Sequence, residues 1–198
     1  NGFPKDVTDR DFGDFRITAS RLVSKQTLID AIPEIKIPNF MFKNLEGKGF
    51  EDVTKDWGLN FGTFSNGAAY GDLDNDGDLD LVINNISDPV LLMENHSNEL
   101  HPNQNYLRIK LTGDKQNLEA IGSTVITYYN NKQQRQSLLS GRGYLSQPEK
   151  TFHLGLGKIK KVDSLKIIWP NGKTQIEINP IVNNLNNYAY RPSNANSL

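Results

Sequence analysis

Acidic residues alternate with other residues in one short stretch of the sequence, Asp72-Leu73-Asp74-Asn75-Asp76-Gly77-Asp78-Leu79-Asp80. A hard cation such as calcium takes about six to eight oxygen ligands, and carboxylates at alternate positions of a tightly wound loop can converge on one ion. Carboxylates packed this closely repel one another strongly unless a counter-ion is present. We therefore predict a calcium site with the ligands Asp72, Asp74, Asp76, Asp78 and Asp80.

The individual positions of this loop suit such a site. Gly77 allows a sharp bend after the third carboxylate, Asp78 would offer its backbone carbonyl, and Asp80 would close the cage. An EF-hand loop needs a glutamate at its twelfth position, which is Ile83 here. Magnesium fits less well, because it prefers retained water and a phosphate partner. The alternative is an acidic turn that binds no ion.

Short strands are predicted on both sides of the loop. Residues 68–70 precede it, and residues 79–83 follow it with the apolar pattern of a strand. Residues 50–54 and 90–93 are further strand candidates. The polar residues 94–105 have the composition of a linker, so we expect a domain boundary there.

Strand-like segments recur at regular spacing in the second half of the chain. They are residues 106–111, 123–129, 134–139, 151–154, 164–169 and 173–178. Asn130-Asn131 suits a tight turn with positive φ, and Pro170-Asn171-Gly172 is typical of a hairpin turn. Six short strands of this kind predict an antiparallel β-sandwich or barrel.

The first forty residues have a different pattern. We predict a helix over residues 25–32, with Ser24 as its N-cap and Pro33 as its stop, and we expect no other substantial helix. Residues 15–19 could form a short strand. The expected fold class is therefore mainly β, with one short N-terminal helix.

Composition excludes several classes of protein. The 198 residues include 22 basic and 23 acidic side chains, so a net charge of −1 gives no reason to expect a nucleic-acid partner. The absence of cysteine excludes disulfides, thiol catalysis and cysteine metal sites. No apolar run approaches the roughly twenty residues of a membrane span. The chain starts at Asn1 rather than Met, so we expect a processed form or a fragment.

The loop and its surroundings resemble the FG-GAP, or VCBS-type, repeat of integrin-like β-propellers. The resemblance is carried by Phe42-Lys43-Asn44, Gly49-Phe50-Glu51-Asp52-Val53-Thr54, Trp57-Gly58-Leu59, Asn66-Gly67-Ala68-Ala69-Tyr70-Gly71-Asp72 and Asn84-Asn85. It implies that the aspartates of the loop bind calcium and that the chain carries one propeller blade. Because a propeller needs about four blades or more, the remaining blades would belong to a longer parent protein.

The second half resembles the ASPIC/UnbV domain, which follows such repeats in the cartilage acidic protein family and in many bacterial surface proteins. The resemblance is carried by Ile121-Gly122-Ser123, Gly141-Arg142-Gly143-Tyr144-Leu145-Ser146-Gln147, His153-Leu154-Gly155-Leu156-Gly157 and Ile168-Trp169-Pro170-Asn171-Gly172-Lys173. The expected organisation is then an N-terminal extension with the helix (1–40), a calcium-binding FG-GAP blade (41–100), an ASPIC/UnbV β-sandwich (101–190) and a flexible tail (191–198).

Two pairs of aromatic or basic residues could contact a ligand. Trp57 and Trp169 could stack on sugar rings, although tryptophans in strands are more often core residues, which is what we expect for both. Arg142 and Tyr144 could also touch a ligand, but a turn with a packed tyrosine is the more common arrangement.

The remaining constellations give no catalytic machinery. His96 and His101 lie in a polar stretch beside glutamates, where solvated loop histidines are more common than a transition-metal site. His153 has the position of a strand surface residue. No nucleophile-elbow, zinc-protease or phosphate-loop motif occurs, so we expect no enzyme.

The favoured function is a non-enzymatic, calcium-binding recognition module that binds a glycan or a surface protein. It would act outside the cell or at the cell surface, either secreted or associated with a bacterial outer membrane. The alternatives are a structural or assembly domain of a larger surface protein and a calcium-dependent enzyme acting on polysaccharides. The enzyme would need paired carboxylates outside the acidic loop.

Overall fold

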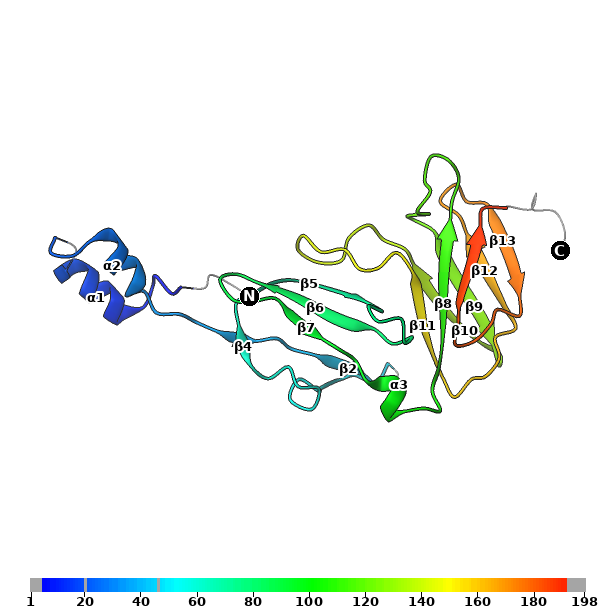
Figure 1. Ribbon diagram of the computed structural model, residues 1–198, viewed down its shortest axis with the longest axis horizontal. Coiled ribbons are helices and arrows are strands. Elements are labelled where there is room, and N and C mark those ends of the chain that lie inside the picture. Colours follow the sequence, from blue (N-terminus) through cyan, green and yellow to red (C-terminus); the bar gives the residue numbers. More distant parts are fainter. Residues whose placement is uncertain (1–4, 20, 46, 192–198) are drawn as a thin grey trace. The chain divides into compact units, whose positions relative to one another are not determined.

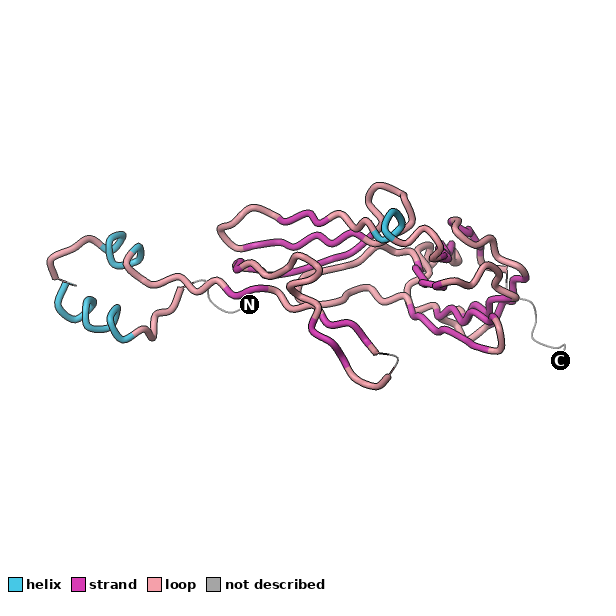
Figure 2. The backbone as a smooth tube through the Cα atoms, turned by 90° about the horizontal axis from the view of Figure 1, so that it is seen from below, coloured by secondary structure: helices cyan, strands magenta, loops and turns pink. Residues whose placement is uncertain are grey.

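A computed structural model describes residues 5–19, 21–45 and 47–191 of the chain (Figures 1 and 2). The described residues form a mainly β fold with several small sheets and a few short helices, as the sequence predicts. The greater part of the expected tail, residues 192–198, lies outside the described residues.

The chain divides into two compact units, and the division does not follow the order of the sequence. Unit 1 contains Asn1–Gly67 and Ile83–Leu91, whereas unit 2 contains Ala68–Val82 and Leu92–Leu198. The acidic loop therefore belongs to the same unit as the regular strands of the second half.

The helices of unit 1 differ in part from the expectation. Helix α2 (Lys25–Asp30) confirms the predicted helix, and the Ser24 side chain accepts a hydrogen bond from the Thr27 amide as its N-cap. Helix α1 (Arg10–Ala19) contains the residues for which a strand was allowed, so that expectation is wrong. The expectation of a single N-terminal helix is wrong as well, because α1 is longer than α2. The physical reason is a cap that the strand pattern hides, because Asp9 Oδ1 accepts from the amide of the buried Phe12 at 2.9 Å. None of the helices in the described residues is long and apolar enough to cross a membrane.

The strands that lie wholly in unit 1 form two small antiparallel pairs. Strand β1 (Ile37–Pro38) pairs with β4 (Gly62–Thr63), and β2 (Phe42–Asn44) pairs with β3 (Phe50–Asp52). Every residue of the β2–β3 pair is exposed, so this hairpin buries no side chain of its own.

A three-stranded sheet in the order β5-β6-β7 carries the acidic loop. Its strands are β5 (Ser65–Gly71), β6 (Asp80–Asn85) and β7 (Leu91–Met93), and the acidic loop is the connection from β5 to β6. The short helix α3 (Ser97–Leu100) follows β7. This order confirms a strand on each side of the loop.

The larger part of unit 2 consists of two sheets. Their seven strands are β8 (Asn105–Thr112), β9 (Thr124–Tyr129), β10 (Lys132–Ser137), β11 (Phe152–Gly157), β12 (Ser164–Ile168), β13 (Thr174–Ile178) and β14 (Leu185–Ala189). One sheet has the order β10-β9-β12-β13 and the other the order β11-β8-β14. The first is antiparallel throughout. In the second, β8 pairs antiparallel with β11 but parallel with β14, which departs from the predicted all-antiparallel arrangement.

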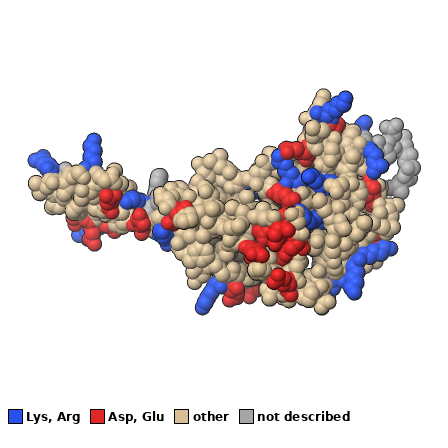
Figure 3. Space-filling view, in the orientation of Figure 1, with Lys and Arg blue, Asp and Glu red and all other residues tan. Residues whose placement is uncertain are grey.

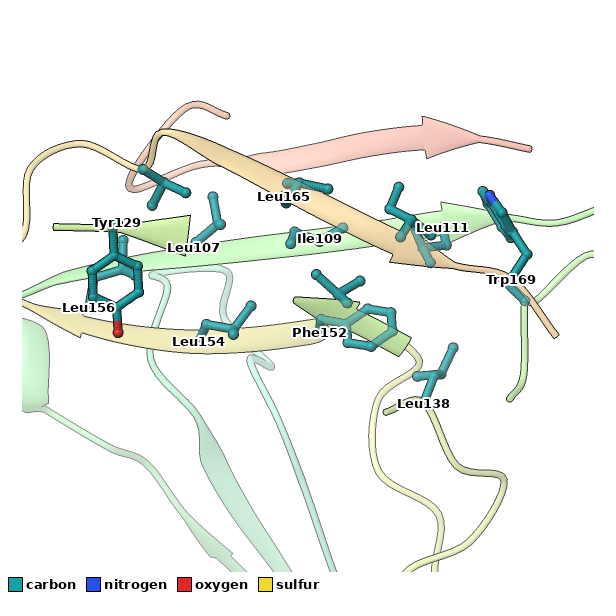
Figure 4. Close-up of a cluster of buried hydrophobic side chains, with 14 residues drawn as sticks. Leu107, Ile109, Leu111, Tyr129, Leu138, Phe152, Leu154, Leu156, Leu165 and Trp169 are labelled. Carbon is teal, nitrogen blue, oxygen red and sulfur yellow. The ribbon is translucent and has the colours of Figure 1, made fainter. Parts of the chain in front are cut away.

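The core of unit 2 follows from alternation along these strands. Leu107, Ile109 and Leu111 occupy every second position of β8, so they all lie on one face and are all buried. Figure 4 shows them among buried side chains from β9, β11 and β12. Each large apolar side chain buried in this way contributes about 1.5–3 kcal/mol to folding. The acidic loop is therefore attached to a unit with a substantial core.

The six strands predicted in the second half are all present. Asn130 and Asn131 have φ angles of 46° and 57°, as the predicted turn requires, and Gly172 has a φ of 80° between β12 and β13. Strand β14 was not predicted, because Leu185-Asn186-Asn187-Tyr188-Ala189 is too polar to stand out as a strand. It pairs with β8, and its Tyr188 packs against the core of unit 2.

Candidate metal centre in the acidic loop

Three of the predicted ligands converge. One carboxylate oxygen from each of Asp72, Asp74 and Asp76 lies within 4.8 Å of the other two, and this cluster could hold a metal ion. Asp72 is buried, whereas Asp74 and Asp76 are exposed. In Figure 3, acidic side chains gather in one patch near the place that α3 occupies in Figure 1.

Hydrogen bonds to backbone amides hold the loop in its wound shape. The Asp76 amide donates to Asp74 Oδ1 at 3.2 Å, and the Asp78 amide donates to Asp76 Oδ1 at 2.9 Å. The Gly77 amide donates to Asp72 Oδ2 at 3.0 Å across the loop. These bonds orient the three carboxylates before any ion arrives, because each carboxylate is tied to the backbone of its own loop.

Asp78 and Asp80 are placed differently from the other three aspartates. Asp80 is buried, and its two oxygens accept hydrogen bonds from the amides of Leu73 (2.8 Å) and Asn95 (3.0 Å). Asp78 is also buried, and its Oδ2 accepts from the Asn98 amide at 3.1 Å. Both side chains therefore fasten the loop to its surroundings, outside the cluster of three.

Two buried oxygens in the loop have no hydrogen-bond partner among the described residues. They are Oδ1 of Asp72 and Oδ1 of Asp78. Burial raises the pKa of both carboxyl groups; the Arg108 guanidinium opposes this shift at Asp72, and the Asn98 amide opposes it at Asp78. A buried carboxylate oxygen without a donor is unfavourable. A cation bound at Asp72 Oδ1, in the cluster of three carboxylates, would supply the missing interaction there, so this cluster fits a metal.

Arg108, on the face of β8 opposite to the core residues Leu107 and Ile109, binds the loop. Its guanidinium forms an ion pair with Asp72 Oδ2 through Nη1 and another with Glu149 Oε1 at 3.0 Å through Nη2. The Arg108 side chain is only 7% exposed. The pairing accounts for one of the loop's negative charges and leaves Oδ1 of Asp72 free.

Tyr106 and His153 contact the bend of the loop at Gly77. Their rings stack with centroids 5.7 Å apart, and His153 Nε2 lies 2.8 Å from the Gly77 carbonyl oxygen. A Cβ at Gly77 would lie 2.0 Å from Tyr106 Cζ. The residue also has a φ of 98°, so both its conformation and its space require glycine.

Sequence reasoning did not find the residues that support the loop. These residues are Tyr106, Arg108 and His153, which lie far from the loop along the chain. The pairing of β8 with β11 places His153 beside Tyr106 and Arg108. Asn95 and Asn98, in the stretch expected to be a linker, donate through their side chains to the Leu79 and Asp76 carbonyls. The sequence signal for these residues was the asparagine-rich composition of the segment that follows β7.

The aromatic residues that could have contacted a ligand differ in burial. Trp169 is 2% exposed, and its Nε1 donates to Gln175 at 3.2 Å, which confirms its expected core position. Trp57 is 53% exposed, so its expected core position is wrong. It lies in unit 1, close along the chain to the buried Leu59, but its own side chain is left largely exposed. Tyr144 is exposed and does not pack as expected, although it does lie in a turn.

The two histidines of the polar stretch are part of the α3 segment. His96 Nδ1 lies 3.6 Å from Glu99, and both side chains are largely exposed. Among the described residues, neither His96 nor His101 belongs to a cluster of metal-ligating side chains.

Comparison with known proteins supports part of this picture. Cartilage acidic protein 1 of Xenopus tropicalis is 31% identical over 108 residues, which cover 54% of this chain but only 16% of that protein. Residues 113–193 match the protein-family model described as "ASPIC and UnbV". This stretch runs from the end of β8 through β14, the strands that form most of the core of unit 2. Residues 113–193 are therefore an ASPIC/UnbV domain, in a chain with distant similarity to cartilage acidic protein 1.

Proposed function

We propose that unit 2 binds one calcium ion in the acidic loop, and that the chain is a non-enzymatic recognition module stabilised by that ion. The observation that carries the proposal is the unpartnered, buried Oδ1 of Asp72 within the cluster of three carboxylates. The donors are all oxygen, which suits a hard cation. Calcium is favoured over magnesium because it accepts more ligands and less regular geometry.

In this proposal Asp72, Asp74 and Asp76 hold the ion through their carboxylates, with Asp78 contributing from the buried side. Asp80 braces the loop through its two backbone bonds. The ion would neutralise the loop and fix the connection between β5 and β6. If the affinity lies in the range of extracellular modules, millimolar calcium would add roughly 1 kcal/mol of stability.

We further propose that the module acts outside the cell or at the cell surface, where millimolar calcium is available, and that its partner is a glycan or a surface protein. The matched relative is named as a cartilage acidic protein, and the matched stretch covers 16% of its length. A larger parent protein is therefore the expected context.

Assembly within that parent is a second candidate role, supported by the surface of unit 1. Exposed large apolar side chains include Phe40, Phe42, Phe50 and Trp57. Such a group of side chains is costly to leave in water and often marks a contact surface. Further FG-GAP blades of the parent protein are the proposed cover. Self-association of this chain, reversed when the preceding repeats are present on the same chain, would support this role.

The calcium proposal is tested by thermal unfolding of chelator-treated protein with and without millimolar calcium. The variants are Asp76→Ala, which removes the ligand, and Asp76→Asn, which keeps an oxygen for the Asp78 amide but loses the charge. Asp163→Asn, at an exposed position of unit 2, is the matched control.

We expect calcium to raise the melting temperature of the wild type and of Asp163→Asn by several degrees, since about 1 kcal/mol corresponds to roughly 2–4 °C for a chain of this size. The rise should vanish in Asp76→Ala and shrink in Asp76→Asn. An unchanged melting temperature in the verified metal-free wild type would refute the proposal.

A further inference from the structure

Arg108 is placed between two carboxylates that belong to different parts of unit 2. Asp72 lies at the start of the acidic loop, and Glu149 lies in the connection between β10 and β11, residues 138–151. The guanidinium is nearly fully buried, so its charge is poorly screened by water. One positive charge is therefore shared between two negative ones.

The contacts of Asp72 divide between its two oxygens. Oδ2 receives the guanidinium and the Gly77 amide, while Oδ1 has no partner among the described residues. Arg108 thus fixes the rotation of the carboxylate without occupying the oxygen that is available to a cation. A cation at Oδ1 would nevertheless compete with Arg108 for the charge of Asp72.

Glu149 ties the β10–β11 connection to the strand before the acidic loop. Its amide donates to the Tyr70 carbonyl at 3.2 Å, and its side chain accepts from Arg108. The connection has no regular secondary structure, and it exposes Tyr144 and Leu145. Leu145 has a φ of 45°, a conformation that costs free energy in a leucine. The connection therefore depends on anchors such as Glu149 for its order.

We propose that Arg108 is a positioning residue that couples cation binding in the acidic loop to the order of the β10–β11 connection. A bound cation neutralises part of the charge of Asp72, so the guanidinium of Arg108 is attracted less strongly to Asp72. The Arg108–Glu149 ion pair then becomes stronger. By linkage, Glu149 raises the affinity of the loop for the cation, because it draws Arg108 away from Asp72. The proposal rests on the proposed calcium site and adds a regulated segment to it.

The first test is a double-mutant cycle on calcium affinity, measured by calorimetric titration of the chelator-treated protein. Glu149→Gln should lower the affinity about fivefold or more while Arg108 is present, the lower end of typical coupling between sites. In the Arg108→Gln background the same change should alter the affinity less than about twofold, because no guanidinium remains to be drawn away. Asp163→Asn is the matched control, since Asp163 is an exposed acidic residue of the same unit that lies outside the β10–β11 connection.

Arg108→Gln leaves Asp72 buried without its counter-charge and could unfold unit 2. Arg108→Lys is the substitute, because a single ammonium cannot pair with both carboxylates as the guanidinium fork does. If neither variant folds, hydrogen exchange of the β10–β11 connection decides. Calcium should slow exchange of its amides in the wild type and in Asp163→Asn, but not in Glu149→Gln.

The outcomes separate the coupling from the calcium site itself. The coupling is overturned if the wild type binds calcium but Glu149→Gln has the same effect in every Arg108 background. It is equally overturned if calcium protects the connection in Glu149→Gln as well as in the wild type. A wild type that binds no calcium overturns both the coupling and the site.

Discussion

The two units of this chain differ in how completely they bury their large apolar side chains. In unit 2 they alternate along paired strands and meet in one buried cluster between the two sheets. In unit 1 the strands are two or three residues long, and several aromatic side chains remain in water. Unit 1 buries a few apolar side chains, including Leu59 and Phe64, but its short strand pairs leave more of them exposed than the long paired strands of unit 2 do.

The candidate metal centre lies on unit 2, which has the larger buried core. The acidic loop is fastened to β8 and β11 by Arg108, Tyr106 and His153. A cation site needs ligands held close to their binding positions, which a well-packed support provides. Unit 2 can therefore be expected to keep the loop in shape whether or not unit 1 has a partner.

The largest effect should come from removing a core side chain of unit 2. Phe152 is 1% exposed, so Phe152→Ala should lower the free energy of unfolding by about 3–5 kcal/mol. Phe50 in unit 1 is 72% exposed, and Phe50→Ala should change it by less than about 0.5 kcal/mol. Denaturant unfolding, followed by Trp169 fluorescence in a Trp57→Phe background, measures both. Equal effects would contradict the contrast between the units.

An intermediate effect is expected where the loop meets its support. Gly77 and Gly143 both have φ angles close to 100°, but only Gly77 has a neighbour where a Cβ would stand. Gly143→Ala should cost about 1–2 kcal/mol from backbone strain alone. Gly77→Ala should cost about 1–3 kcal/mol more, because Tyr106 must move. Denaturant unfolding of the two variants measures the difference. Similar losses of unfolding free energy would mean that the ring of Tyr106 can move aside at little cost.

The smallest effect is expected at Trp57. Trp57→Phe should leave the free energy of unfolding within about 0.5 kcal/mol of the wild type, since the side chain is largely exposed. The remaining emission, from the buried Trp169, should be shifted to shorter wavelength relative to the wild type. An unshifted spectrum, or a large loss of stability, would show that Trp57 is packed in solution and that unit 1 has a larger core than described here.

The sequence by itself determined the local features of this protein. Alternating carboxylates around Gly77 marked the loop, because ligand spacing within nine residues depends only on local backbone winding. Apolar alternation marked the six strands of the second half, and Asn130-Asn131 marked a turn that needs positive φ. Each of these features is encoded by residues that are neighbours along the chain.

Only the tertiary structure decided what supports the loop. Arg108, on β8, pairs with Asp72, and Glu149, 41 residues further along the chain in the β10–β11 connection, pairs with Arg108. The polar strand β14 is likewise evident from its pairing with β8 rather than from a pattern of its own. These contacts depend on strand pairing between distant parts of the chain. The hydrophobic periodicity of a single sequence does not indicate which distant charged residue will pair with a buried aspartate.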